Sequence, residues 1–415
     1  MATTDGLAEV RRGPTLAACL IVRDEEAVLA ECLGSLDGVV DEIVVYDTGS
    51  VDRTIEIAES SGALVVAGSW TGNFSAARNA ALGAVSSDWV LSIDADERAV
   101  ADPAALRDAI RSGSPGAYLV QIHQLLDPNV GSSYRYATTK LFRRQGARWS
   151  GWVHERPCDG SGCQLPAQAL DPAVLSFVHE GCWSAEAQRE RARRNAEIGT
   201  RELHALAAED GSPERERVAH VLLDLGRSLT GMGNYDDAVA TFEVLRDLAP
   251  GSRQAVHGTD YLVRLLLGAG RAVEALELVE DLRGAGEAVA YCDWLAGQAH
   301  VQLGDAAGAW RLIAPISEVV DTAGRRSDAG ELHEVRALVA AAAGHHASAA
   351  DDLAEAMVTY GRVVGRGALL RHLWWAAGRR GDPLAELAGR DGPYCGAILR
   401  EAMSGDQQDT PSRSR

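Results

Sequence analysis

Short apolar runs alternate with helical patterns over residues 15–127, and this alternation constrains the fold more than any other feature. Four apolar runs predict strands, at 15–22, 41–49, 63–68 and 88–96. Three segments between them predict helices, at 25–36, 51–62 and 73–85. Near-continuous runs of Val, Ile and Leu that are separated by helices are typical of parallel strands covered on both faces. The sequence therefore predicts an α/β domain with a doubly wound, mostly parallel sheet.

From about residue 200 onward, strand-like runs disappear and helices rich in Ala and Leu dominate. A glycine recurs at 233, 270, 304 and 344, and an alanine follows five residues later at 238, 275, 309 and 349. The spacing is close to that of the 34-residue helix–turn–helix repeat of tetratricopeptide type. In such a repeat the glycine allows a tight turn and the alanine allows two helices to approach closely. A degenerate unit at 374–387 is expected to cap the stack.

These patterns divide the chain into four parts. We predict a flexible N-terminus at 1–13, an α/β domain at 14–200, an all-α helical repeat domain at 201–403 and a disordered tail at 404–415.

Composition excludes several classes of protein. The net charge of −19 argues against nucleic-acid binding, which requires a basic face. No apolar run reaches the roughly 18 residues of a membrane span, and the N-terminus lacks a secretory apolar core, so we expect a cytoplasmic protein. Lys140 is the single lysine beside 39 arginines, which we attribute to a GC-rich coding sequence.

Seven cysteines, an odd number, indicate reduced thiols in preference to a disulfide framework. The alternative is a structural zinc site or a disulfide within one cluster, although the spacings match no CxxC pattern. That cluster comprises His154, Cys158, Cys163, His179 and Cys182.

Polar residues follow three of the predicted strands, and ligands of doubly wound sheets bind at that carboxyl edge. Asp94 and Asp96 end the fourth strand, where residues two apart project to the same face. Two converging carboxylates suit Mg²⁺ or Mn²⁺, whereas the alternative is a solvated strand end or a helix cap. Glu97 should lie on the opposite side and begin the next helix or pair with an arginine.

Two further segments carry candidate residues. In DTGSVDRT (47–54), helix capping accounts for Ser50, Asp52 and Thr54 but not for Asp47, which could accept a hydrogen bond from a base. Arg78 lies in a predicted helix that packs on the sheet, and a buried arginine needs a carboxylate or phosphate partner. The alternative for Arg78 is a surface ion pair.

Two His-Glu pairs each follow a strand-like stretch, at 154–155 and 179–180. Histidine is a common metal ligand and glutamate can act as a general base. The alternative is that both histidines are structural.

Taken in order, five segments resemble family 2 glycosyltransferases with the GT-A fold over residues 14 to 200. The segments are ACLIVRDEE, DEIVVYDTGSVDRT, W…NFSAARNAAL, DWVLSIDADE and LFRR…WSGWVHE. Two groups are most similar, the lipopolysaccharide-core glucosyltransferases and the glycocin S-glycosyltransferases. The latter also carry tetratricopeptide-like helices.

The resemblance implies a UDP-sugar donor, Mg²⁺ or Mn²⁺ and inversion at the sugar. It implies that Asp47 contacts uracil, that Ile21, Arg23 and Glu25 line the nucleoside, and that Arg78 lies near uracil or the diphosphate. It further implies that Asp94 binds ribose or the donor sugar and that Asp96 binds the metal. His179, or else His154, completes the metal site, and Glu155 is the base. The chain lacks the ED acceptor motif of many such enzymes.

The leading hypothesis is transfer of a sugar to Ser or Thr oxygen or Cys sulfur of a peptide or protein, as in bacteriocin glycosylation. The repeats would hold the acceptor or form a homodimer, since helical repeats offer extended concave surfaces. The alternatives are a small natural product or saccharide acceptor, and a non-catalytic scaffold that binds a nucleotide sugar. No membrane acceptor is expected.

Overall fold

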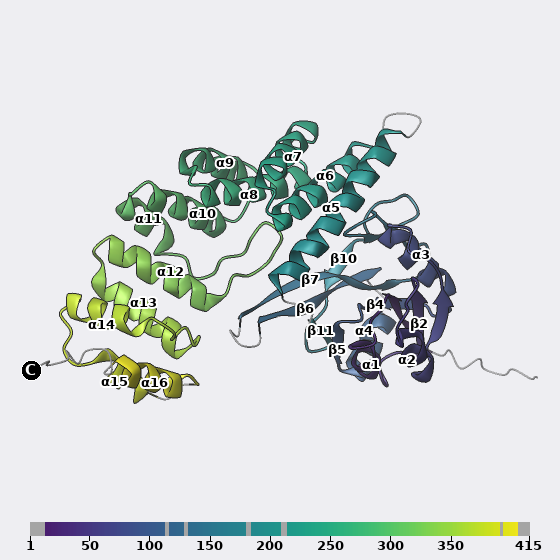
Figure 1. Cartoon of the computed structure of the whole chain (residues 1–415), viewed down its shortest axis with the longest axis horizontal. Coiled ribbons are helices and arrows are strands. Elements are labelled where there is room, and N and C mark those ends of the chain that lie inside the picture. Colours follow the sequence, from purple (N-terminus) through teal and green to yellow (C-terminus); the bar gives the residue numbers. More distant parts are fainter. Residues whose placement is uncertain are drawn as a thin grey trace, which may run out of the picture. The chain divides into compact units, whose positions relative to one another are not determined.

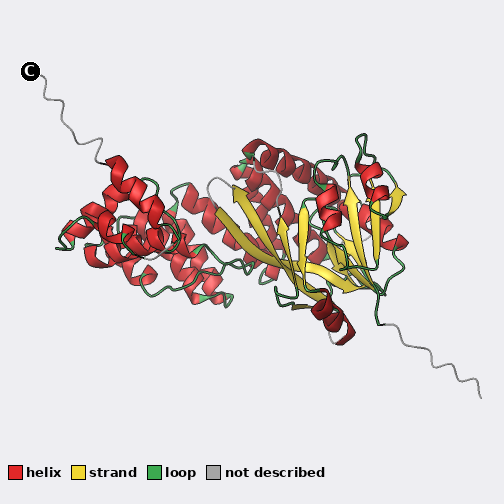
Figure 2. Cartoon of the chain, turned by 90° about the horizontal axis from the view of Figure 1, so that it is seen from below, coloured by secondary structure: helices red, strands yellow, loops and turns green. Residues whose placement is uncertain are grey.

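The computed structural model describes residues 13–112, 116–127, 132–179, 184–208, 214–390 and 393–405. It divides into two compact units, Met1–Asn234 and Tyr235–Arg415. The named strands all belong to the first unit, as the yellow arrows of Figure 2 show. Apart from Gly13, Ser404 and Gly405, the two predicted tails lie outside the described residues.

One mixed sheet dominates the first unit (Figure 1). Its strand order is β3-β2-β1-β4-β7-β6-β11-β5, with β10 beside β6. Its strands are β1 Leu16–Val22, β2 Glu42–Asp47, β3 Leu64–Ala67, β4 Trp89–Ser92, β5 Glu97–Ala101, β6 Ala117–Asp127, β7 Ser132–Arg143, β10 Ala167–Ala169 and β11 Leu175–His179. A separate hairpin joins β8 Arg148–Ser150 to β9 Arg156–Cys158. The strands β1 to β4 pair in parallel, and β7 enters antiparallel between β4 and β6. The predicted mostly parallel α/β sheet is confirmed, with an antiparallel insertion that the pattern did not predict.

Alternate residues of β1 belong to two hydrophobic clusters, one on each face of the sheet. Leu16, Leu20 and Val22 pack with residues of α1 Leu29–Gly34 and α4 Pro103–Ser112, among others. Ala17 and Cys19 pack with residues of α3 Phe74–Ala84. Both faces of β1 are therefore covered by helices, which explains why its sequence is apolar throughout.

The first helices are shorter than predicted. α1 begins at Leu29 and α2 spans Thr54–Ser60. The residues before α1 form turns, because side chains bind their backbone amides: Ser50 Oγ accepts from Asp24 N at 2.9 Å, and Thr54 Oγ1 from Glu25 N at 2.7 Å. These bonds join the ends of β1 and β2.

The strand predicted at 88–96 ends at Ser92, so Asp94 and Asp96 lie in the turn between β4 and β5. The two carboxylates therefore do not lie on one face of a strand, and the predicted placement is wrong. Glu97 is the first residue of β5 and is 1% exposed. It begins no helix, and its partner is Lys140 instead of an arginine.

Two helices complete the first unit, α5 Ala185–Ala207 and α6 Arg215–Met232. α5 runs through the predicted domain boundary at 200/201, and α5 and α6 pack together. α5 is also held by the sheet domain, since Glu202 accepts from Trp152 N at 2.9 Å. The first unit therefore extends to residue 234, because its last two helices pack as one layer.

Helices make up the named elements of the second unit in the residues that the structure describes. Its helices are α7 Tyr235–Leu248, α8 Arg253–Gly268, α9 Ala272–Gly284, α10 Val289–Gln302, α11 Ala306–Ile313, α12 Ala329–Ala342, α13 His346–Val358, α14 Gly367–Ala376, α15 Pro383–Ala388 and α16 Cys395–Gly405. Successive helices pack in pairs such as α8 on α9 and α12 on α13. None of the helices in the described ranges is long and apolar enough to cross a membrane.

The repeat glycines and alanines have the roles that the sequence predicts. Glycines 233, 270, 304 and 344 all have positive φ, between 73° and 83°. Alanines 238, 275, 309 and 349 are all fully buried. The helix–turn–helix repeat is therefore confirmed, with the glycine in the left-handed conformation that ends a helix and the alanine at a helix contact.

Candidate active site

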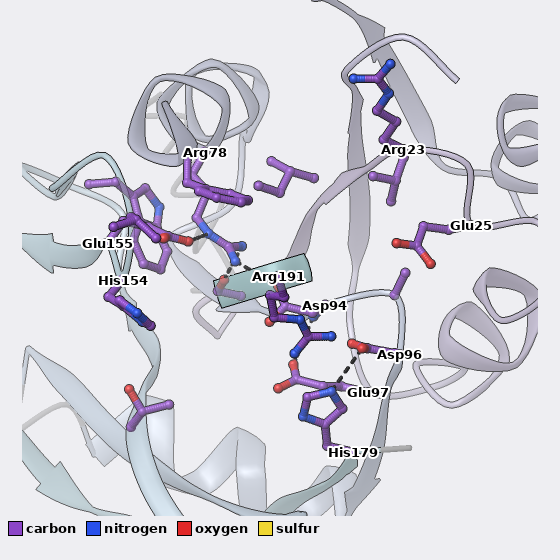
Figure 3. A pocket seen from close by; sticks show the side chains of 18 of the residues that line it. Arg23, Glu25, Arg78, Asp94, Asp96, Glu97, His154, Glu155, His179 and Arg191 are labelled. Carbon is purple, nitrogen blue, oxygen red and sulfur yellow. Dashed lines mark hydrogen bonds and ion pairs between the residues drawn. The ribbon is translucent and has the colours of Figure 1, made fainter. Parts of the chain in front are cut away.

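An open cavity of about 620 Å³ lies at the carboxyl ends of β1 and β4 in the first unit (Figure 3). This volume is in the usual range for a small-molecule site. Nine of the ten predicted site residues line it: Ile21, Arg23, Glu25, Arg78, Asp94, Asp96, His154, Glu155 and His179. Asp47 is not among the lining residues.

Arg78 projects from the face of α3 that packs on the sheet and is 9% exposed. Its Nη2 donates to Asp94 Oδ1 at 2.7 Å, its Nη1 donates to Ser92 Oγ at 3.1 Å, and its Nε donates to Glu155. The prediction that a buried arginine needs a carboxylate or phosphate partner is confirmed with two carboxylates, and the alternative of a surface ion pair is wrong.

Lys140, on β7, holds the same aspartate from the other side. Its Nζ lies 3.0 Å from Asp94 Oδ2 and 2.9 Å from Glu97 Oε2. Burial alone would lower the pKa of Lys140, but the two carboxylates raise it above its usual range. Burial would likewise raise the pKa of Asp94, but Lys140 and Arg78 hold it well below its usual range.

These contacts form one chain of alternating charge, which we call the charged chain: Glu155, Arg78, Asp94, Lys140 and Glu97. Breaking a buried ion pair by removing one partner costs about 3–5 kcal/mol, because the other charge stays buried. Both carboxylate oxygens of Asp94 are occupied by cations of the protein. Asp94 is therefore fixed in position, and Asp96 is the aspartate of this turn that remains available to an added cation.

Asp96 and His179 meet at the edge of the cavity, with 2.9 Å between Oδ2 and Nε2. Burial alone would lower the pKa of His179, but the hydrogen bond to Asp96 and the nearby carboxylates raise it. Burial and the charges of Asp96 and Asp94 raise the pKa of Glu25 to about 7. An added cation would relieve this repulsion between carboxylates.

The donor set fits a hard divalent ion. Mg²⁺ is usually bound by one or two carboxylates together with substrate phosphates and water. Asp96 supplies one such carboxylate, and the imidazole of His179 lies beside it. No group of three or more His, Cys, Asp or Glu side chains within the described residues is arranged to hold a metal, which gives the zinc hypothesis no support there. Cys182 and Glu180, which belong to that hypothesis and to the second His-Glu pair, lie outside the described residues.

Asp47, at the end of β2, is 2% exposed. Its Oδ1 accepts from Gly49 N and from Ser50 N, each at 3.0 Å. The conclusion that capping leaves Asp47 unexplained is therefore wrong, because this carboxylate itself binds the turn. Thr48, the next residue, lines the cavity in its place. The contact of Asp47 with uracil stays a prediction.

His154 and Glu155 follow the hairpin strand β8. His154 has a φ of 50°, a left-handed conformation that is uncommon outside glycine. Figure 3 shows His154 beside Glu155 and on the far side of Arg78 from Asp96. Burial lowers the pKa of His154. Of the two histidines proposed to complete the metal site, His179 is the one in contact with Asp96.

Sequence reasoning missed Lys140 as a site residue, and it missed three residues of α5 that line the cavity: Arg191, Arg194 and Asn195. One signal for Lys140 was present, since it is the single lysine of an arginine-rich chain. For the residues on α5 no local motif existed.

Residues 18–146 match the model of the family described as Glycosyl transferase family 2. This chain contains a family 2 glycosyltransferase domain. The domain contributes Glu25, Arg78, Asp94, Asp96 and Lys140 to the cavity. Glu155, His179 and the residues of α5 come from the chain that follows the matched region.

Several curated proteins are similar to parts of this chain. A TPR repeat-containing protein of Synechococcus elongatus is 48% identical over 85 residues, which is 20% of this chain and 21% of that protein. An uncharacterized glycosyltransferase of Rickettsia felis is 38% identical over 82 residues, or 20% of this chain and 29% of that protein. The glycosyltransferase SunS of Bacillus subtilis is 26% identical over 204 residues, or 48% of this chain and 47% of that protein. The chain thus matches less than half the length of each of these relatives.

Among solved structures, a glucosyl-3-phosphoglycerate synthase from Mycobacterium tuberculosis in complex with Mn²⁺ and UDP-glucose is 21% identical, with a TM-score of 0.31. The overlap covers 48% of this chain and 81% of that chain. MamA from Desulfovibrio magneticus is 18% identical, with a TM-score of 0.31, over 42% of this chain and 93% of that chain.

Proposed function

We propose that this protein is an inverting glycosyltransferase that moves a sugar from a UDP-sugar to a peptide or protein side chain and depends on a divalent metal. One observation carries the proposal: in a family 2 domain, the charged chain fixes Asp94 at the floor of a cavity while Asp96 and His179 meet beside it. A non-catalytic scaffold would not need so many partly buried ionic groups at one cavity.

The charges of the cavity favour a diphosphate together with a cation. Glu25, Asp94, Asp96 and Glu97 line one part of the cavity, and this part would repel a bare diphosphate. Asp96 and His179 would hold Mg²⁺ or Mn²⁺. When bound, the metal would stabilise the negative charge that develops on the leaving diphosphate.

The residues that line the cavity would then have separate roles. Arg78 and Lys140 hold Asp94 in one orientation toward ribose or the donor sugar. Ile21, Arg23 and Glu25 lie where the nucleoside would bind. Such preorganised charges need no rearrangement during the reaction, which is the main source of their catalytic effect.

The transfer itself exchanges one bond for another. An acceptor Ser or Thr oxygen, or Cys sulfur, attacks the anomeric carbon, and the bond from that carbon to the β-phosphate oxygen breaks with its electron pair on UDP. The acceptor proton passes to the carboxylate of Glu155, which acts as a general base. General-base catalysis typically raises the rate by about 10²–10⁴-fold. Arg78 orients that carboxylate.

The acceptor is proposed to be a polypeptide on two grounds. The motifs resemble those of the glycocin S-glycosyltransferases, and the similarity to SunS extends over 204 residues, beyond the length of the family 2 domain. The helical repeats also offer the extended surface that a flexible peptide requires.

The test measures UDP release from a panel of UDP-sugars, with and without EDTA, together with the mass of a peptide encoded beside this gene. We expect metal-dependent addition of one sugar mass with one donor. Asp96→Ala should abolish metal-dependent transfer, and Glu155→Gln should lower the transfer rate at least about 100-fold while UDP affinity changes little.

Asp108→Asn, on the exposed surface of α4, is the matched control and should transfer at the wild-type rate. Metal-dependent transfer that survives in Asp96→Ala would disprove the metal assignment. An unchanged peptide mass with UDP release toward a saccharide would favour the alternative acceptor class.

A further inference from the structure

Three residues of α5 line the cavity, although α5 lies wholly outside the region that matches the family 2 model. Arg191, Arg194 and Asn195 are three and four residues apart, so they lie on one face of this 23-residue helix. Figure 3 shows Arg191 pointing into the cavity toward Asp94 and Asp96.

The environment of the two arginines differs from that of their neighbour. Arg193 forms ion pairs with Glu190 and Glu197 along the helix. Within the described ranges, no hydrogen bond or ion pair to a carboxylate is found for Arg191 or Arg194; the Arg194 guanidinium instead lies 5.5 Å from the centre of the Phe74 ring. Two cations thus face the cavity without a carboxylate between them.

The charge of each arginine also affects other groups at the cavity. The positive charge of Arg191 acts to lower the pKa of Glu25, which also lines the cavity. Partial burial and the charge of Arg191 lower the pKa of Arg194, although the charge of Glu190 acts in the opposite direction.

α5 is held firmly enough to present these side chains. Glu202, which is 8% exposed, accepts from Trp152 N, and Arg201 stacks 5.8 Å from the Trp152 ring. Arg201 also approaches Gly72, whose φ of 77° and lack of a side chain leave room for the guanidinium. The helix is therefore anchored about two to three turns beyond the arginines.

We propose that Arg191 and Arg194 form an anion subsite for the diphosphate of the nucleotide-sugar donor, so that α5 completes the active site of the family 2 domain. This inference rests on the proposed function. Guanidinium groups bind phosphate oxygens with two parallel hydrogen bonds, and they would stabilise the charge left on UDP when the glycosyl bond breaks. The acidic part of the cavity and the two arginines would bind the donor from opposite sides.

The test compares binding of UDP and of uridine to the full-length protein with Mg²⁺, by calorimetry. Arg191→Gln/Arg194→Gln should weaken UDP binding about 10- to 100-fold, or about 1.4–2.7 kcal/mol, because the charge-assisted hydrogen bonds to the diphosphate are lost, while uridine affinity stays the same. Arg193→Gln, on the same helix, is the matched control and should bind UDP like the wild type. Arg191→Lys/Arg194→Lys keeps the charge and should bind UDP more tightly than the double Gln variant.

Two outcomes would contradict the proposed anion subsite. Equal UDP affinity in the double Gln variant and in Arg193→Gln would overturn it, and unchanged UDP affinity with slower transfer would assign the arginines to the acceptor. A wild-type protein that binds neither UDP nor any UDP-sugar would overturn the proposed function as well, so the two failures are distinguishable.

Discussion

At the scale of single residues, Lys140 shows most clearly how the site is built. It is 7% exposed and pairs with two carboxylates that lie 46 and 43 residues away in the sequence. An arginine-rich chain that keeps one lysine, and buries it at the cavity, indicates a site that a compact ammonium fits and a planar guanidinium does not. Coding bias can explain why the chain has a single lysine, but it does not explain why that lysine is buried at the cavity.

Replacing Lys140 should destabilise the protein through the charges it leaves behind. Lys140→Met should lower the free energy of unfolding by about 3–5 kcal/mol, because Glu97 stays buried without its cation. The measurement is urea unfolding of the full-length variant.

The double variant Lys140→Met/Glu97→Gln removes both charges and is the control. It should recover much of the stability but not the transfer activity, since Asp94 still lacks its second cation. A loss of less than about 1 kcal/mol in Lys140→Met would show that the pair adds little to stability.

At the scale of elements, hydrogen bonds between side chains and turns hold both ends of β2 in the sheet. Asp47 binds the turn after β2, and Glu42, at the start of β2, binds the turn before β4. Glu42 accepts from the backbone amides and hydroxyl groups of Ser86 and Ser87, at 2.7 to 3.1 Å. The carboxylate thus joins two segments that are 44 residues apart.

This contact predicts a pH dependence of stability. Burial alone would raise the pKa of Glu42, but the hydrogen bonds from Ser87 and Ser86 lower it below its usual value of 4.5. A carboxylate whose pKa is lower in the folded state stabilises the protein. This stabilisation is fully present when the pH is above the pKa of the unfolded state, and it is lost as the pH falls through the pKa of the folded state.

Thermal unfolding from pH 3.5 to 7 measures the effect. The difference in Tm between the wild type and Glu42→Gln should be largest above about pH 5 and should shrink as pH falls below 4.5. Glu59→Gln, at an exposed position of α2, should show no such change. A Tm difference that is constant over this range would contradict the assignment.

At the scale of the whole molecule, the boundary between the two units decides which part of the chain can fold alone. The sequence places it at 200/201, where strand-like runs end, whereas the structure places it at 234/235. A chain that ends at residue 200 cuts α5 and removes α6, which leaves Gly199 without the Leu225 side chain that packs beside it.

Truncation tests this boundary. A variant comprising residues 1–234 should unfold cooperatively and keep its UDP affinity, whereas one comprising 1–200 should be poorly folded because α5 has lost α6 and the Glu202 contact. Circular dichroism during heating and calorimetry with UDP provide the measurements. Equal cooperativity in both variants would support the boundary drawn from the sequence.

The sequence by itself determined the features that depend on neighbouring residues. The order of strands and helices over residues 15–92, the glycine–alanine repeat and the need of Arg78 for a carboxylate all followed from local patterns, and the structure confirms them. Periodicity reports which face of an element is buried, so these features were predictable. The roles given to Asp47, Glu155 and His179 came from resemblance to a family and stay predictions.

Only the tertiary structure decided which distant residues share the cavity. It inserted β7 antiparallel beside β4, which brings Lys140 to Asp94, and it placed α5 so that Arg191 and Arg194 reach the same cavity. It also moved Asp94 and Asp96 from a strand into a turn. The physical reason is that a buried charge is stable only beside its partner, and the partner is chosen by how strands and helices pack, not by the residues next to it in sequence.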